Sequence, residues 1–369
     1  MFLNVGVYRD NSDTVRYHLD HFKKHTPNEW AVYDDLGHFL NSGHPVRIAI
    51  LHLPYPFTDD TQAKLDAVYA ISDLVFVIGS ELHDSTLEFI LNNDRPNIVY
   101  YTCGFINQPL QHAVVKQYFD WFETSRYFYR DYLPEMLQRI DYRNPKEMQF
   151  DILLGRKKLH RDYVYKFVKS ALRVENRVLT YFNEHEIDFA TGNEQWIWED
   201  RGMQFENTPK WTVDFVRYYG HRMSISQVIP ITLYNQTAYS VVTETNFSNA
   251  YSFYTEKTAK PIIARRLFVM FAGQHYLRNL RSLGFKTFDG IIDESYDSIE
   301  DNNYRWAAAC KQIEWLCKQD QRTILEQIQP IVEHNFSVMM TTDWHSVFVQ
   351  DLEVRVDTLL EQRQHLLSS

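Results

Sequence analysis

The feature that most constrains the fold is an alternation of short apolar runs with amphipathic segments over the first hundred residues. Four runs rich in Val and Ile have the length and composition of buried strands: FLNVGV (2–7), VRIAILHL (46–53), LVFVIG (74–79) and NIVYYTCG (97–104). Segments with helical spacing lie between them and begin near Asp or Ser, at 13–25, 59–71 and 83–93. Repetition of strand, helix and strand at this spacing predicts a parallel sheet with helices on both faces.

A second alternation begins at FDILLG (150–155). Further strands are expected at 177–182, 237–245 and 266–272, and helices at 159–173, from near Thr255, at 275–283, at 299–319 and throughout the tail from 321. Residues 107–146 mix aromatic and charged side chains without a strand pattern, which is typical of a helical linker. Residues 183–222 are polar and rich in Trp, and we expect a loop insertion there.

Two successive alternations predict an α/β protein with two Rossmann-like domains that face a cleft. A chain of 369 residues suits two domains. The expected division is an N-terminal domain with its linker at 1–145, a C-terminal domain at 146–340 and a C-terminal helix at 341–369. In sheets of this kind, ligands bind beyond the carboxyl ends of the strands.

The composition of the chain bears on its cellular location and on whether it binds DNA. The formal net charge of -10 weighs against non-specific DNA binding. The longest apolar runs are too short to span a bilayer, and the N-terminus lacks the basic leader of a signal peptide. Three cysteines, Cys103, Cys310 and Cys317, lack metal-binding spacing and fit a reducing compartment. We therefore expect a cytoplasmic protein.

Several enzyme classes lack their motifs in this chain. It has no Gly-x-Gly-x-x-Gly, no P-loop lysine motif and no Gly-x-Ser-x-Gly elbow, which disfavours dehydrogenases, P-loop NTPases and serine hydrolases. The nearest pattern to a metal-binding Asp-x-Asp is Glu186-Ile187-Asp188, which lies in a polar stretch and is interpreted as surface. We expect neither a metal nor another cofactor.

The triplet Thr255-Glu256-Lys257 follows the expected strand at 237–245 and an aromatic run. One interpretation is a capped helix, with the hydroxyl of Thr255 as the cap and Glu256 near the positive end of the dipole. The other is a ligand site, because a helix N-terminus with a Lys can bind phosphate and a Glu can bind ribose hydroxyls.

The stretch VVTETNFSNAYSFYTEKTAKPI (241–262) resembles the signature of the α-1,3-fucosyltransferase family and related bacterial and viral glycosyltransferases. The resemblance covers roughly residues 148–320 and implies a two-Rossmann, GT-B type enzyme. It implies that Glu256 holds the donor ribose and that Lys257 holds the diphosphate. Glu244 matches an earlier Glu of the signature. Thr255 and Asn246 belong to the same set, and Thr245 stands between Glu244 and Asn246.

The basic stretch FDILLGRKKLHRDYV (150–164) resembles the start of the C-terminal domain of these enzymes. Arg161 is the preferred candidate for a second contact to the diphosphate, followed by Arg156. The alternative is a solvated basic turn, since charge clusters usually face water. Near 284–305, Asp293, Ser295 and Asp297 are expected to cap the helix that follows, or else a carboxylate there receives a hydroxyl of the donor sugar.

Inverting transfer requires a general base beside the acceptor hydroxyl, and the resemblance implies a carboxylate of the N-terminal domain. Glu81 is the first candidate, followed by Asp60 and His52, all near expected strand ends. The expected function is transfer of a sugar from a nucleotide-diphosphate sugar to a glycan or other hydroxyl acceptor, inverting and without a metal. The alternatives are a non-catalytic nucleotide-sugar-binding or scaffold protein and a viral-type DNA base glycosyltransferase.

Overall fold

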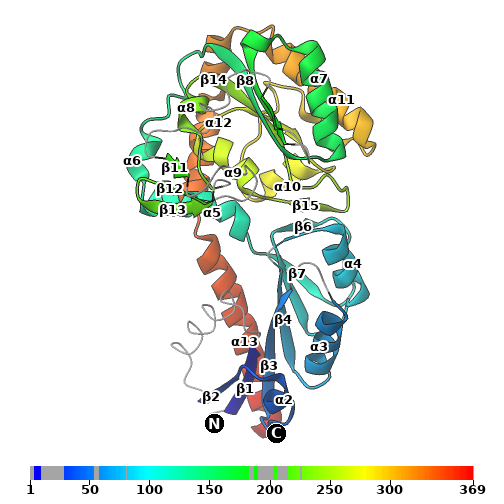
Figure 1. Cartoon of the computed structure of the whole chain (residues 1–369). Helices are drawn as coiled ribbons and strands as arrows, with labels where there is room; N and C mark the ends of the chain where they lie inside the picture. Colours follow the sequence, from blue (N-terminus) through cyan, green and yellow to red (C-terminus); the bar gives the residue numbers. More distant parts are fainter. Residues whose placement is uncertain are drawn as a thin grey trace. The chain divides into compact units, whose positions relative to one another are not determined.

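The computed structural model describes residues 4–9, 29–53, 58–79, 81–182, 187–189, 203–205, 215–224 and 227–368. They belong to an α/β protein that divides into two compact units (Figure 1). Unit 1 comprises Met1–Asp120 and Asp343–Ser369, and unit 2 comprises Trp121–Thr342. The first boundary lies at Asp120 and not at the expected 145, because the segment after Asp120 folds with unit 2, whereas the C-terminal segment expected at 341–369 is observed as Asp343–Ser369 of unit 1.

The sheet of unit 1 has, in the described part, six parallel strands in the order β2-β1-β3-β4-β5-β7. Their bounds are β1 (Asn4–Arg9), β2 (Glu29–Tyr33), β3 (Val46–Leu53), β4 (Leu74–Gly79), β5 (Ile98–Thr102) and β7 (Val114–Gln117), with the short β6 (Gly104–Ile106) before β7. Strands β3, β4 and β5 lie inside the sheet and are almost wholly buried. A buried parallel strand requires an apolar side chain on both faces, which explains their Val-rich and Ile-rich runs.

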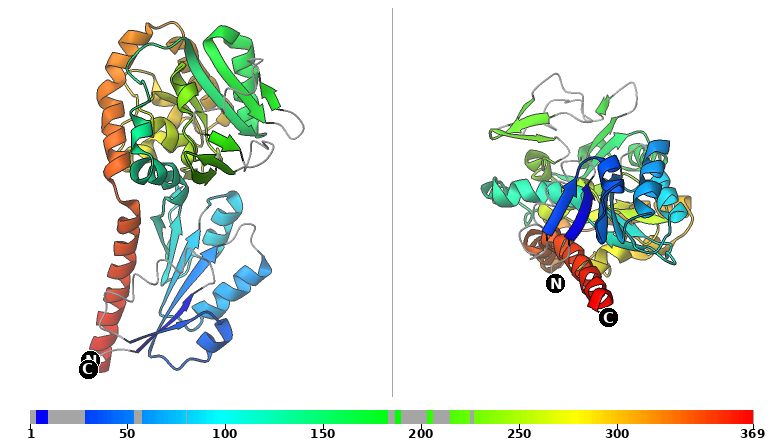
Figure 2. Two further views of the ribbon diagram at one scale, coloured as in Figure 1. Left: turned by 60° about the vertical axis from the view of Figure 1, so that its left-hand side comes forward. Right: turned by 90° about the horizontal axis from the view of Figure 1, so that it is seen from below.

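Helices cover both faces of this sheet. Three helices pack on one face through Phe39, Leu65 and Phe89: α2 (Leu36–Leu40), α3 (Asp59–Tyr69) and α4 (Asp84–Asn92). The C-terminal helix α13 (Trp344–Ser368) packs on the other face through Phe348, Leu352 and neighbouring apolar residues. Figure 2 shows α13, in red, running alongside the strands of unit 1. The last helix of the chain thus completes the core of the first unit.

The sheet of unit 2 is built, among the described residues, from four parallel strands and an antiparallel edge strand, in the order β10-β9-β8-β14-β16. The bounds are β8 (Met148–Arg156), β9 (Arg177–Phe182), β10 (Ile187–Phe189), β14 (Thr237–Thr243) and β16 (Phe268–Phe271). A separate antiparallel sheet contains β11 (Met203–Phe205), β12 (Phe215–Tyr218) and β13 (His221–Ser224). Both main sheets confirm the predicted α/β class.

Helices α7 (Leu159–Ala171) and α11 (Asn302–Leu316) lie on one side of this sheet, with α9 (Glu256–Ile263) and α12 (Gln321–Thr341) on the other (Figure 1). The remaining elements of unit 2 are α5 (Asp120–Asp131), α6 (Pro134–Leu137), η1 (Val174–Asn176), α8 (Ile231–Tyr234), β15 (Tyr251–Phe253), α10 (Tyr276–Ser282) and η2 (Glu294–Ser298). No helix in the described ranges is both long and apolar enough to cross a membrane.

The strand order of unit 2 contains a topological switch point. From β8 the chain passes through α7 to β9 on one side, and it later returns to β14 on the other side of β8. The connections therefore leave the carboxyl ends of β8 and β14 in opposite directions. Ligands of open α/β sheets bind at such a point.

Several expected elements differ from the observed ones. Strands β2 and β7 and helix α2 were not predicted, and β7 lies within the presumed helical linker. The stretch at 183–222, expected to be a loop insertion, contains β10, β11, β12 and the start of β13 in its described part. The helix expected at 13–25 lies outside the described residues, as does Glu186.

Candidate functional site

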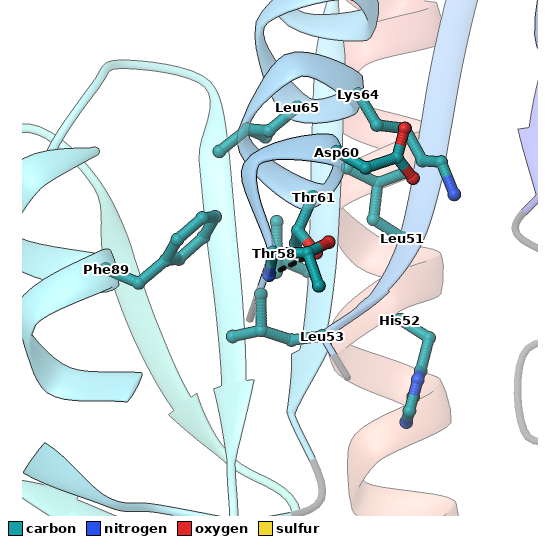
Figure 3. A pocket seen from close by; sticks show the side chains of 10 residues that line it. Leu51, His52, Leu53, Thr58, Asp60, Thr61, Lys64, Leu65 and Phe89 are labelled. Atoms are coloured by element: carbon teal, nitrogen blue, oxygen red, sulfur yellow. Dashed lines mark hydrogen bonds between the residues drawn. The ribbon is translucent and has the colours of Figure 1, made fainter. Parts of the chain in front are cut away.

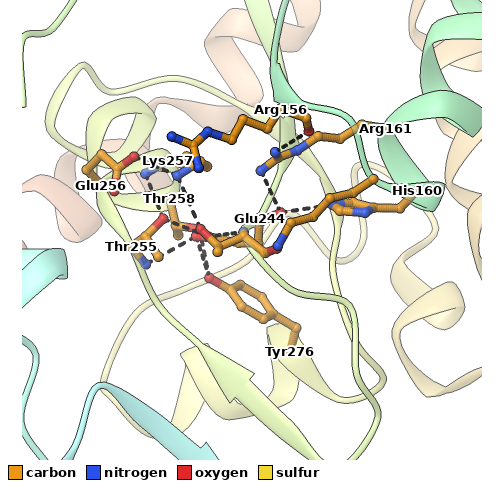
Figure 4. Close-up of polar contacts among 11 residues, drawn as sticks. Arg156, His160, Arg161, Glu244, Thr255, Glu256, Lys257, Thr258 and Tyr276 are labelled. Atoms are coloured by element: carbon orange, nitrogen blue, oxygen red, sulfur yellow. Dashed lines mark hydrogen bonds and ion pairs between the residues drawn. The ribbon is translucent and has the colours of Figure 1, made fainter. Parts of the chain in front are cut away.

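Glu244 directly follows β14, and its side chain is fully buried. Its Oε2 accepts hydrogen bonds from the N–H of Thr245 (3.0 Å) and the hydroxyl of Thr255 (2.7 Å). Its Oε1 accepts from the N–H of Thr255 (3.3 Å) and from the hydroxyls of Thr258 (2.6 Å) and Tyr276 (3.0 Å) (Figure 4). A buried carboxylate needs such partners, and these fix its orientation.

The backbone of Glu244 joins the ends of β8 and β14. Its carbonyl accepts from Nε2 of His160 (2.8 Å) and from NH2 of Arg161 (3.2 Å). The same guanidinium donates through NH1 to the carbonyl of Arg156 (2.7 Å). A Cβ on Gly155 would lie only 3.3 Å from NH1, so the absence of a side chain there lets the guanidinium lie against β8. Arg161 is buried and bonded to two strand ends.

His160, the second residue of α7, is fully buried. Burial, together with the nearby charge of Arg161, lowers the pKa of this imidazole to about 3. The ring is therefore neutral near pH 7, and Nε2 carries the hydrogen that it donates to Glu244.

The N-terminus of α9 is capped within the protein. Thr255 is the N-cap residue, and its hydroxyl accepts from the N–H of Lys257 (3.3 Å). The carboxylate of Glu244 lies at the same end and complements the positive end of the helix dipole. The capped-helix interpretation of Thr255 is confirmed. An anionic ligand at this end must therefore be held mainly by side chains.

Cationic side chains gather beside this cap. Nζ of Lys257 lies 2.6 Å from Oε1 of Glu256 and 3.3 Å from the hydroxyl of Thr245. The side chain of Lys257 is 32% exposed and that of Glu256 is 9% exposed. The exposed Arg156 extends toward both (Figure 4). One carboxylate beside two cations gives a surface suited to an anion.

Electrostatics at this surface depend on a third cation, Lys260. Burial lowers the pKa of Lys260 to about 8, although the charge of Glu256 acts to raise it. Burial alone would raise the pKa of Glu256, but Lys257 and Lys260 more than offset this effect, so that pKa lies below its ordinary value. Glu256 is therefore an ionised hydrogen-bond acceptor at neutral pH.

Asn246 lies in the segment between β14 and β15. Its Oδ1 accepts from Nζ of Lys158 (3.2 Å), which also bonds to the carbonyl of Thr245. This contact joins the turn after β14 to the turn before α7. Asn246 therefore lies with the other predicted donor residues.

The acidic stretch near 294 has a structural role that differs from the expected one. Asp293 caps the short helix η2, and α11 is capped by Asp301. Asp297 instead accepts from the backbone N–H groups of Leu277 (2.8 Å) and Arg278 (2.9 Å). The carboxylate of Asp297 thus caps α10, a helix that precedes it in the chain, and the expectation that it caps the following helix is wrong.

In unit 1, two of the three candidate bases line one hollow of about 100 Å³ (Figure 3). It lies at the carboxyl end of β3 and the start of α3, with His52 and Asp60 among its polar lining. Thr58, Thr61 and Lys64 complete the polar side, and the walls are apolar. Asp60 is exposed and His52 is half-buried.

Glu81, the first candidate base, lies between β4 and α4. Its Oε2 lies 2.6 Å from Nε2 of His83, and its backbone carbonyl accepts from the hydroxyl of Thr86 in the first turn of α4. Glu81 is not among the described residues that line the hollow. Within the described part of the chain, no group of three or more His, Cys, Asp or Glu side chains is arranged to hold a metal ion.

Sequence reasoning missed Thr258 and Tyr276. Thr258 ends the run Thr-Glu-Lys-Thr. Its position about one turn after the cap residue could have indicated that it lies near the same site. Tyr276 lies at the start of α10 and reaches Glu244 only through the tertiary fold.

No protein-family model, curated protein or solved structure matches this chain.

Proposed function

We propose that this protein is a glycosyltransferase that moves a sugar from a nucleoside-diphosphate sugar to a hydroxyl acceptor, and that unit 2 binds the donor. The observation that carries the proposal is the placement of Glu256, Lys257 and Arg156 together beyond the carboxyl ends of β8 and β14. This is the switch point of the sheet, where ligands of open α/β folds bind.

Each side chain has a distinct part in this proposal. Lys257 and Arg156 hold the diphosphate, because both are cations with exposed surface beyond the carboxyl ends of β14 and β8. Glu256 accepts hydrogen bonds from the ribose hydroxyls. Arg161 acts indirectly, because its guanidinium holds the carbonyls of Arg156 and Glu244 in place.

The reaction that fits these groups is a direct, inverting displacement at the anomeric carbon. The bond from that carbon to the diphosphate breaks as the acceptor oxygen attacks from the opposite face. Lys257 and Arg156 stabilise the charge that develops on the leaving diphosphate. A base must take the acceptor proton, and Asp60 and His52 are preferred over Glu81 because they line a hollow. This mechanism needs the two units to face a cleft, as in GT-B enzymes.

Calorimetry with a panel of nucleoside diphosphates tests donor binding and identifies the base. We expect one nucleotide to bind in the presence of a chelator, and we expect Lys257→Ala to weaken that binding at least tenfold, since a charge-assisted bond contributes about 1.5–3 kcal/mol. Lys169→Ala, at an exposed lysine of α7, is the matched control. Equal affinity of Lys257→Ala and wild type would refute the assignment.

A second candidate is a nucleotide-sugar-binding protein without catalytic activity. The observation that favours it is the hydrogen bond between the carboxylate of Glu81 and the ring of His83, because it engages the side chain of the first candidate base. Slow hydrolysis of the nucleotide sugar separates the two functions, because a pure binding protein binds the donor and leaves it intact.

A further inference from the structure

We infer that Tyr276 is a positioning residue for the donor site, acting through Glu244 and Thr258 on the first turn of α9. The inference rests on the proposed function, because the side chains it positions, Glu256 and Lys257, belong to that site. Tyr276 lies in a different segment and was not among the residues expected to bind the donor.

The contacts form a closed triangle. The hydroxyl of Tyr276 lies 3.0 Å from Oε1 of Glu244 and 2.8 Å from the hydroxyl of Thr258, which itself donates to the same Oε1 at 2.6 Å. The three residues come from the start of α10, the end of β14 and the second half of the first turn of α9. All three are buried, so water does not compete for these bonds.

Tyr276 can act as a fixed point because its own position is determined from two sides. Asp297 accepts the N–H groups of the next two residues, Leu277 and Arg278, and thereby fixes the start of α10. The ring of Tyr254 packs on the ring of Tyr276 with 4.5 Å between centroids, and its hydroxyl donates to the carbonyl of Tyr276 at 2.7 Å.

The triangle positions the site because Thr258 is the immediate neighbour of Lys257 on α9. The same carboxylate that accepts from Thr258 also accepts the hydroxyl and N–H of the N-cap residue Thr255. Glu256 and Lys257 therefore lie between two residues that are bonded to Glu244. Loss of the Tyr276 hydroxyl removes one of the bonds that hold Glu244, and the first turn of α9 then opens more often.

The test compares Tyr276→Phe with Tyr100→Phe. Each variant removes one hydroxyl that donates a hydrogen bond from a buried tyrosine, but Tyr100 lies in unit 1 and donates to the carbonyl of Asn93. In the ligand-free protein, we expect amide hydrogen exchange at Lys257, Thr258 and Ala259 to increase about fivefold in Tyr276→Phe, the equivalent of one net hydrogen bond. Tyr100→Phe should leave these three amides close to wild type.

Nucleotide affinity provides the second measurement. We expect Tyr276→Phe to weaken binding of the best nucleoside diphosphate about fivefold. Thr258→Val should behave in the same way, while Thr258→Ser, which keeps the hydroxyl, should restore wild-type affinity. Equal exchange or equal affinity in Tyr276→Phe and Tyr100→Phe would overturn the inference. If wild type binds no nucleoside diphosphate, the proposed function fails, and the exchange comparison still decides whether Tyr276 positions the turn.

Discussion

The guanidinium of Arg266 and the carboxylate of Asp151 form an ion pair in the core of unit 2, with 2.6 Å between NH2 and Oδ2. Their side chains are only 2% and 4% exposed. Asp151 also accepts the hydroxyls of Thr237 and Ser240, and Arg266 also donates to the carbonyls of Thr237 and Tyr234. The pair joins β8 to the segment before β16. Because both side chains are buried, their polar groups are paired where water is excluded.

Replacement of one partner of this pair should destabilise unit 2. Arg266→Met leaves the carboxylate of Asp151 buried without its counter-ion, and we expect the free energy of unfolding to fall by about 3–5 kcal/mol. Urea unfolding followed by circular dichroism measures the change. Arg173→Met is the control, because the side chain of Arg173 is 80% exposed, and it should stay within about 0.5 kcal/mol of wild type. A loss below 1 kcal/mol in Arg266→Met would contradict a structural role.

Glu294 should make the stability of unit 2 depend on pH. Burial raises the pKa of Glu294 to about 7, against hydrogen bonds and the charge of Arg281 that act to lower it. A carboxyl whose pKa is raised in the folded protein stabilises the fold through its protonated form. This contribution is complete at a pH below the pKa of the unfolded state, and it disappears as the pH rises through about 7. The expected size is about 3 kcal/mol. The free energy of unfolding of wild type minus that of Glu294→Gln should fall as the pH rises from 4 to 8. A constant difference would argue against the raised pKa.

Binding of the nucleotide should weaken above pH 8. Lys260 has a pKa of about 8, so it carries a positive charge beside the proposed diphosphate site below that pH and loses the charge above it. The affinity should be measured between pH 7 and pH 9.5, because a terminal phosphate with a pKa of about 6 is already ionised over that range. Lys260→Met should weaken binding at pH 7 and remove the pH dependence over this range. Equal pH profiles for wild type and variant would exclude Lys260 as the titrating group.

The candidate bases can be separated by turnover. Asp60→Asn should leave nucleotide binding intact and lower transfer by a factor of about 100 or more, the usual scale for a lost general base. Glu81→Gln should have a smaller effect, because Glu81 pairs with His83 and does not line the hollow. The reverse order of effects would return the role to Glu81. A product that retains the anomeric configuration of the donor would exclude the displacement mechanism.

The sequence predicts the interior strands better than the edges. The bounds of β3, β4 and β9 agree with the runs at 46–53, 74–79 and 177–182, because an interior parallel strand needs apolar side chains on both faces. The edge strands β2, EWAVY, and β7, VVKQ, carry polar and charged residues and lack that pattern. Edge strands need less burial, so their composition resembles that of loops.

The candidate site was predictable where the chemistry is local. Thr255 was recognisable as a cap from the spacing of Thr-Glu-Lys, and the structure has it at the N-terminus of α9. The environment of Arg161 was not predictable, because the side chain turns back to the carbonyls of Arg156 and Glu244 and is buried. Contacts between residues about 80 positions apart leave no pattern in the spacing of either segment.

Unit 1 contains two separate pieces of chain, and this has a consequence for synthesis on the ribosome. Its sheet lacks the cover provided by Phe348, Leu352 and Val356 of α13 until residues 344–368 have emerged. Unit 2 is a single continuous segment and can fold earlier, since domains fold as units during translation. During this interval one face of a Val-rich and Ile-rich sheet is open to water. We therefore expect a nascent chain stalled before α13 to bind chaperones that recognise exposed apolar surface.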